Sequence, residues 1–178
     1  MSLTDCDIAL ELWAHLPALI KIQADILVVY SRSVKWAQSL VTAAAALDAP
    51  TSRIHVYAEE LTAENKGLSA LLKREHIDAV IVSLPILVQP EVARQCLAAG
   101  KHVLCEKPVA ENVQEAVQLI SDYEKAFRPR ELMFSVAEQF RHERAFTRTR
   151  ELVVVGGRIG KLNHLHARVW GNAWPVEN

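Results

Sequence analysis

The chain has 178 residues, of which 51% are hydrophobic and 23% are charged, a balance typical of about one globular domain with an apolar core. The formal net charge of −1 excludes the strongly basic surface of a nucleic-acid-binding protein. The longest apolar stretch, residues 79–88, is too short to span a bilayer and is interrupted by Ser83 and Pro85. No basic segment precedes an apolar one at the start of the chain, so we predict no secretory signal and a cytoplasmic location.

Strand-like and helix-like patterns alternate along the whole chain, which favours a parallel sheet with helices on its faces. Apolar residues at helical spacing predict a first helix over residues 8–20, which Pro17 should end or kink. After it we expect a buried strand at 26–30, an alanine-rich helix at 34–47, a short strand at 54–57 and a helix at 67–75.

The same alternation continues through the second half of the chain. Pro90 suits the first turn of a helix, and Gly100 supplies the positive φ that ends one. We expect strands at 79–83, 102–105, 132–136 and 162–170, and helices at 89–99, 113–126 and 143–153.

The cysteines and a histidine pair do not form a recognisable metal or disulfide pattern. Cys6, Cys96 and Cys105 are odd in number and lack C-x-x-C spacing, so we interpret them as reduced thiols of an intracellular protein. Cys105 should be buried and inert. His164 and His166 share one face of a predicted strand but have no third ligand, which favours a packed or surface pair over a metal site.

The sequence GKHVLCEKP, residues 100–108, is the most informative stretch. A short apolar strand is followed by Glu106 and Lys107, at the strand end where open α/β sheets bind their ligands. The alternative is a solvated Glu–Lys pair of negligible energy. We favour the ligand-binding position.

The stretch HIDAVIVSLPILVQPEVARQCLAAGKHVLCEKPVAENVQEAVQLI, residues 76–120, resembles the Gfo/Idh/MocA oxidoreductases, especially their fungal members. The resemblance extends from about Leu16 to Trp174. It implies a Rossmann domain that binds a dinucleotide, followed by an α/β domain whose open sheet holds the substrate. We therefore expect a partial, doubly wound parallel sheet over residues 1–150. Residues 151–178 are then the connector and the opening strand of a truncated second domain.

The resemblance also shows a departure at the start of the domain. Dinucleotide-binding domains open with a strand, a glycine-rich turn and a helix that holds the pyrophosphate, but no glycine precedes Gly67 here. We expect the family's first strand and its turn to be missing, which leaves the central position of the sheet open. The backbone groups on either side must then pair with each other, with water or with another chain. The glycines of residues 156–160 precede a predicted strand, so we interpret them as a connector and not a phosphate loop.

The resemblance assigns roles to the Glu-Lys-Pro residues. It places Lys107 beside the nicotinamide and the reacting hydroxyl, as a catalytic and substrate-binding residue whose ammonium is partly desolvated. Glu106 would lie near the cofactor and balance that charge. A cis peptide bond before Pro108 is also implied.

Ser31 and Arg32 follow the strand at 26–30, where a NAD-specific domain places an acidic residue. An arginine flanked by hydroxyls suits the 2′-phosphate of NADP, so we predict NADP over NAD. A helix N-cap at Ser31 or Ser33 beside a solvated Arg32 is a compatible alternative.

The remaining candidate residues follow other predicted strands. The resemblance places Leu84 and Pro85 in the segment that lies beneath the cofactor in relatives. It also places Gln139 at the cofactor and Arg141 at the border of the substrate pocket. A buried structural role is the alternative for Arg141.

The function implied is hydride transfer between nicotinamide and a sugar-like or diol hydroxyl carbon, with a small-molecule substrate and NADP or NAD as ligands. Without the glycine-rich turn and the second domain, we expect this activity to be impaired. A non-catalytic, nucleotide-binding or regulatory relative and an inactive fragment remain open, as does assembly into a homo-oligomer.

Overall fold

The computed structural model describes residues 7–161, 163–164 and 166. The chain divides into two compact units, Met1–Ala137 and Glu138–Asn178. Helix α6 (Arg144–Arg150) contacts its neighbours in the second unit. The expected end of the nucleotide-binding domain at residue 150 stays a prediction.

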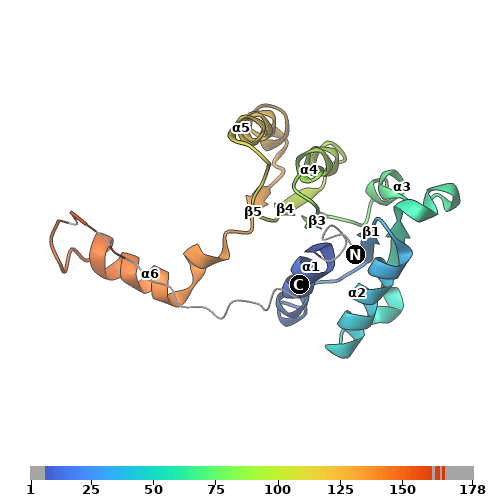
Figure 1. The fold of residues 1–178 in the computed structure, drawn as a ribbon, viewed down its shortest axis with the longest axis horizontal. Coiled ribbons are helices and arrows are strands. Elements are labelled where there is room, and N and C mark those ends of the chain that lie inside the picture. The colour runs from blue at the N-terminus through green and yellow to red at the C-terminus, as the bar shows by residue number, and fades with distance from the viewer. Residues whose placement is uncertain (1–6, 162, 165, 167–178) are drawn as a thin grey trace, which may run out of the picture. The chain divides into compact units, whose positions relative to one another are not determined.

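Parallel strands form two separate sheets in the first unit (Figure 1). β1 (Val28–Ser31) pairs with β2 (His55–Ala58). β4 (His102–Cys105) lies between β3 (Ala79–Val82) and β5 (Phe134–Val136). The predicted α/β class, with an incomplete Rossmann-like arrangement, is confirmed. β1 and β3 are not bonded to each other, so the sheet is interrupted where we expected the central strand to be missing.

Helices alternate with these strands. Two of them begin at the polar caps that their sequences suggest: the Ser33 hydroxyl accepts from the Trp36 N–H at 3.3 Å, and the Asn112 side chain accepts from the Glu115 N–H at 2.9 Å. The α-helices of the first unit are α1 (Asp7–Lys21), α2 (Val34–Ala46), α3 (Leu68–Leu72), α4 (Gln89–Ala98) and α5 (Val113–Asp122); shorter or irregular helices are η1 (Thr51–Arg53), η2 (Glu59–Glu64), η3 (Tyr123–Phe127) and η4 (Arg128–Arg130).

Helix α1 does not end at Pro17, which lies inside it. Proline removes one backbone hydrogen bond of a helix, yet the helix continues, and the Ile22 N–H donates to the Ala18 carbonyl at 3.0 Å. Contacts of α1 with α2 and the burial of Leu16 favour the continued helix.

Each sheet has a hydrophobic core of its own. The core beneath β1 contains Leu16, Val29, Ala37, Leu40, Ala43 and Ala44. The core beneath β3 and β4 contains Val82, Ala93, Cys96, Leu97, Val103, Cys105 and Leu132. No residue belongs to both.

The second unit is helical in its described part. It contains η5 (Gln139–His142), α6 and η6 (Glu151–Val155), with the rings of Phe140 and Phe146 6.2 Å apart between centroids. Apart from residues 163, 164 and 166, the strand expected at 162–170 lies outside the described residues. No described helix combines the length and the apolar character needed to cross a bilayer.

Candidate functional site

The Glu106-Lys107-Pro108 turn leaves the sheet at the carboxyl end of β4. The Glu106 N–H donates to the Val82 carbonyl at 2.8 Å, and this bond fixes the start of the turn beside the end of β3. The peptide bond between Lys107 and Pro108 is cis, as the resemblance implied.

Gln89, in the first turn of α4, holds this turn in place. Its side chain is only 2% exposed. The Nε2 group donates to the Glu106 carbonyl at 2.8 Å and to the Pro108 carbonyl at 3.0 Å, and Oε1 accepts from the Leu84 N–H at 3.2 Å. One buried amide therefore ties together the segments that follow β3 and β4. We did not predict this role, although a glutamine between the Leu84-Pro85 pair and Pro90 was a visible signal.

Both carboxylate oxygens of Glu106 have partners in the chain. Oε1 lies 2.8 Å from Nε2 of His15 on α1, and Oε2 accepts from the backbone N–H of Lys107 at 2.9 Å. Glu106 is 9% exposed, so its carboxylate is largely shielded from solvent and is hydrogen-bonded by these two groups. Sequence reasoning did not single out His15, which lies 91 positions earlier.

The side chain of Lys107 is exposed. The partial desolvation that we expected for its ammonium is therefore not observed. Among the described ion pairs, the Glu106 carboxylate pairs with His15 and not with Lys107. The structure thus places Lys107 at the predicted strand end, with its side chain exposed.

A second group of polar side chains lies at the carboxyl ends of β1 and β2. Ser31 is 3% exposed, whereas Arg32 is exposed. Ser33 is the N-cap of α2, as expected in the alternative in which Ser31 or Ser33 begins a helix. The ribose end of a dinucleotide site at these residues stays a prediction.

Two carboxylates that we had not predicted contact residues on either side of Arg32 in the sequence. Glu59 and Glu60 directly follow β2, whose end lies beside that of β1. The Tyr30 hydroxyl donates to Glu59, and Glu60 Oε2 accepts from the Val34 N–H at 2.9 Å. Burial, together with the hydrogen bond to Glu59, raises the pKa of the Tyr30 hydroxyl. An acidic pair immediately after a predicted strand was the signal that we overlooked.

The other predicted residues are divided between the two units. Leu84 and Pro85 are half-buried just after β3, close to the Gln89 contacts. Gln139 and Arg141 belong to η5 of the second unit, and both are exposed. The buried role considered for Arg141 is therefore not observed.

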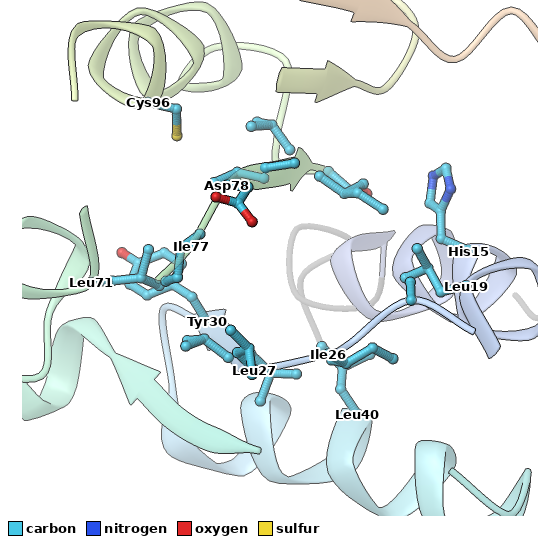
Figure 2. A pocket seen from close by; sticks show the side chains of 18 of the residues that line it. His15, Leu19, Ile26, Leu27, Tyr30, Leu40, Leu71, Ile77, Asp78 and Cys96 are labelled. Atoms are coloured by element: carbon cyan, nitrogen blue, oxygen red, sulfur yellow. The ribbon is translucent and has the colours of Figure 1, made fainter. Parts of the chain in front are cut away.

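A cavity of about 500 Å³ lies between the two sheets of the first unit (Figure 2). Figure 2 shows Ile26 and Leu27, which precede β1, on one side, and Ile77 and Asp78, which precede β3, on the other. Neither Lys107 nor Arg32 lines this cavity. The cavity thus occupies the open central position of the sheet, and its lining includes His15, which contacts Glu106, and Leu84, which follows β3.

Comparison with known proteins identifies the family. Residues 14–138 match the model of an oxidoreductase family with an NAD-binding Rossmann fold. The chain belongs to the Gfo/Idh/MocA oxidoreductases. Dehydrogenase FPY6 of Fusarium mangiferae is 35% identical over 150 residues, which are 82% of this chain and 40% of that protein. The dTDP-3,4-didehydro-2,6-dideoxy-alpha-D-glucose 3-reductase of Streptomyces violaceoruber is 35% identical over 102 residues, 57% of this chain and 28% of that one.

Solved structures of Gfo/Idh/MocA relatives agree with this assignment. An oxidoreductase from Thermotoga maritima superposes with a TM-score of 0.64 at 29% identity, over 82% of this chain and 40% of that chain. A 3-ketoreductase from Actinomadura kijaniata, in complex with TDP-benzene and NADP, gives a TM-score of 0.61 at 27% identity, over 85% and 42%. The present chain thus spans less than half the length of each relative.

Proposed function

We propose that the chain forms part of an NADP-dependent oxidoreductase that acts on a sugar-like or diol hydroxyl or carbonyl group. The observation that carries the proposal is the pair of hydrogen bonds, called the clamp, from the buried Gln89 side chain to the carbonyls of Glu106 and Pro108 in the Glu106-Lys107-cis-Pro108 turn. It presents Lys107 at the carboxyl edge of parallel strands, where α/β folds bind ligands. The names of a Streptomyces 3-reductase and of the myo-inositol 2-dehydrogenase of Thermotoga maritima support this substrate class.

The described residues fit one end of NADP and not the other. Exposed Arg32 beside the N-cap of α2 suits a 2′-phosphate, because guanidinium groups bind phosphates through two parallel hydrogen bonds. The pyrophosphate needs a glycine-rich turn between a strand and a helix, and no described strand leads into a helix through a G-x-G-x-x-G sequence. NADP, when bound, supplies or accepts the hydride. We assign Arg32 to its ribose end and derive no catalytic step.

A titration of NADPH and NADH against the purified chain, followed by nicotinamide fluorescence, tests the proposal. We expect NADPH to bind more tightly than NADH, and Arg32→Ala to weaken NADPH binding by about tenfold or more, because a charge-assisted hydrogen bond contributes roughly 1.5–3 kcal/mol. Lys35→Ala removes a nearby exposed charge and should have a much smaller effect. Equal affinities for the two cofactors, unchanged by Arg32→Ala, would refute the role of Arg32.

A non-catalytic, nucleotide-binding relative is the second candidate function. The engagement of Glu106 by His15 favours it, because a carboxylate that is already paired does not balance the charge of Lys107. Binding of NADPH without oxidation or reduction of myo-inositol or sugar ketones would select this candidate. Turnover that is lost in Lys107→Met but kept in the exposed control Lys125→Met would select the enzyme.

We also propose a cytoplasmic location, a small-molecule substrate and no nucleic-acid partner. The two buried free cysteines, Cys96 and Cys105, support a reducing compartment. Assembly into a homo-oligomer stays a prediction that sedimentation analysis of the purified chain would test.

A further inference from the structure

The carboxylate of Glu106 has two basic side chains as candidate partners, His15 on α1 and Lys107 next in the chain. His15 Nε2 lies 2.8 Å from Oε1, whereas the Lys107 ammonium has no hydrogen bond or ion pair with any described residue. An ionised carboxylate only accepts hydrogen bonds, so Nε2 carries the shared hydrogen. The side chains of His15 and Glu106 are 18% and 11% exposed, so solvent screens this contact only weakly.

The other polar atoms of the turn already have partners near it. The clamp from Gln89 holds the carbonyls of Glu106 and Pro108. The second carboxylate oxygen, Oε2, accepts from the backbone N–H of Lys107 at 2.9 Å. Oε1 is therefore the carboxylate oxygen whose partner, His15, lies far from the turn in the sequence.

His15 contacts the turn from a helix that packs in the other core of the first unit. The next residue, Leu16, is buried in the core beneath β1, and α1 contacts α2. Figure 2 shows His15 on this helix, beside the cavity. Glu106 follows β4, whose residues Val103 and Cys105 belong to the core beneath β3 and β4. The partner of the carboxylate thus comes from outside the half of the unit that carries Lys107.

We propose that His15 is a positioning residue, which keeps the Glu106 carboxylate out of an ion pair with Lys107 and leaves the ammonium available to a ligand oxygen. Without His15, a largely buried carboxylate oxygen would lack a partner, which is unfavourable. The flexible four-carbon stem of a lysine would then allow the ammonium to take that place.

This inference deepens the proposed function. The hydroxyl or carbonyl oxygen that Lys107 would bind rests on the proposed oxidoreductase function, whereas the positioning itself needs no cofactor. An ammonium that is already paired with a neighbouring carboxylate is a weaker donor to such an oxygen. His15 would therefore act on the ligand through Glu106 and Lys107, without contacting it.

The test measures how fast a water-soluble amine-acylating reagent modifies Lys107 in the full chain, at one fixed pH, by mass spectrometry of peptides. Only the neutral amine attacks the reagent, and an ion pair with Glu106 favours the charged form, so pairing slows the reaction. Exposed Lys125 serves as the internal reference. Lys101 is buried, and its Nζ donates to the Arg74 carbonyl at 2.7 Å, so its modification reports opening of the fold.

Two substitutions of His15 separate its hydrogen bond from its bulk. His15→Leu keeps apolar bulk and removes the donor, and we expect modification of Lys107, relative to Lys125, to slow by about threefold. His15→Gln keeps an N–H group that can reach Glu106, and should behave as the parent chain. Adding Glu106→Gln to His15→Leu should restore the parent rate, which a purely structural role of His15 would not do.

A substitution in the parent chain keeps the proposal falsifiable if His15→Leu opens the fold. Glu106→Gln alone should leave the rate at Lys107 unchanged, because the parent carboxylate is not paired with it. A faster rate in this variant would overturn the proposal. So would equal rates in the parent and a folded His15→Leu, or a double variant that stays slow.

Failure of the proposed function is read separately, from the titration of NADPH. If NADPH does not bind while the rates at Lys107 follow the expected pattern, the oxidoreductase function is refuted and the positioning role of His15 stands. If NADPH binds while the rates at Lys107 do not depend on His15, the positioning role is refuted and the proposed function stands.

Discussion

At the scale of single residues, Gln89 is the side chain on which the candidate site depends. Gln89→Leu keeps much of the apolar bulk but removes three hydrogen bonds. Since a buried polar group without a partner costs about 1–3 kcal/mol, we expect faster backbone hydrogen exchange in the segment that follows β4. Gln95→Leu is the matched control, because the exposed side chain of Gln95 bonds to Glu91 and not to this segment. Equal exchange in the two variants would show that the turn holds without the clamp.

The two buried thiols give a second prediction at this scale. Burial raises the pKa of both Cys96 and Cys105 to about 12, and each side chain is fully buried. The expected burial of Cys105 is thus confirmed. At mildly alkaline pH both thiols stay protonated, so a water-soluble disulfide reagent should leave them unmodified in the native chain and modify them in concentrated urea. Peptide mapping separates them from Cys6; fast native labelling at Cys105 would contradict its burial.

At the scale of elements, α4 and α5 are joined by an ion pair between Arg94 Nε and Asp122 Oδ2 at 3.0 Å. Hydrogen bonds from Gln118 and Arg94 hold the pKa of the Asp122 carboxyl below its usual 3.8. A carboxyl whose pKa is lowered in the folded state stabilises it above the unfolded pKa, and this stabilisation is lost as the pH falls through the folded pKa. Asp122→Asn should therefore unfold more easily than the parent chain at neutral pH.

That difference should shrink as the pH falls below 3.8, when the parent loses the same charge. Denaturant unfolding at a series of pH values measures it. Asp48→Asn changes an exposed carboxyl outside any described ion pair and should show no such pH dependence. A difference that stays constant with pH would exclude the charge of Asp122 as its cause.

The elements were predictable where the sequence marks both of their ends. Gly100, with φ of +80°, closes α4, and Glu106 ends the apolar run, so β4 was predicted at its observed bounds. The helix predicted over 67–75 is shorter, Leu68–Leu72, because no residue pattern marks its end. The helix predicted over 113–126 changes after Asp122 into the wider turn of η3.

The candidate site was predictable only in part. The positions of Glu106 and Lys107 follow from the rule that ligands bind at strand ends, together with the family resemblance. The contacts of His15 and Gln89 with Glu106 join residues 91 and 17 positions apart. Such contacts depend on how helices pack, and local periodicity does not contain that information.

At the scale of the whole molecule, every buried residue of the described chain lies before residue 138. A chain that ends at Ala137 should therefore keep the thermal unfolding profile of the full chain, with each midpoint shifted by no more than about 2 °C, because removing exposed residues changes stability by little. Circular dichroism during heating measures the midpoint. A loss of about 5 °C or more, roughly 1 kcal/mol for a domain of this size, would show that the second unit stabilises the first.

The separation of the two cores has a consequence for how cooperatively the first unit melts. Two-state unfolding requires that loss of packing in one part of the unit destabilises the other part. Here each sheet has its own cluster of buried apolar residues, and the two halves of the unit share none of them. A calorimetric scan of the isolated chain would then contain two overlapping heat-absorption peaks, one for each half. A molecule inserted between the halves would link them, and the peaks would merge into one sharper transition.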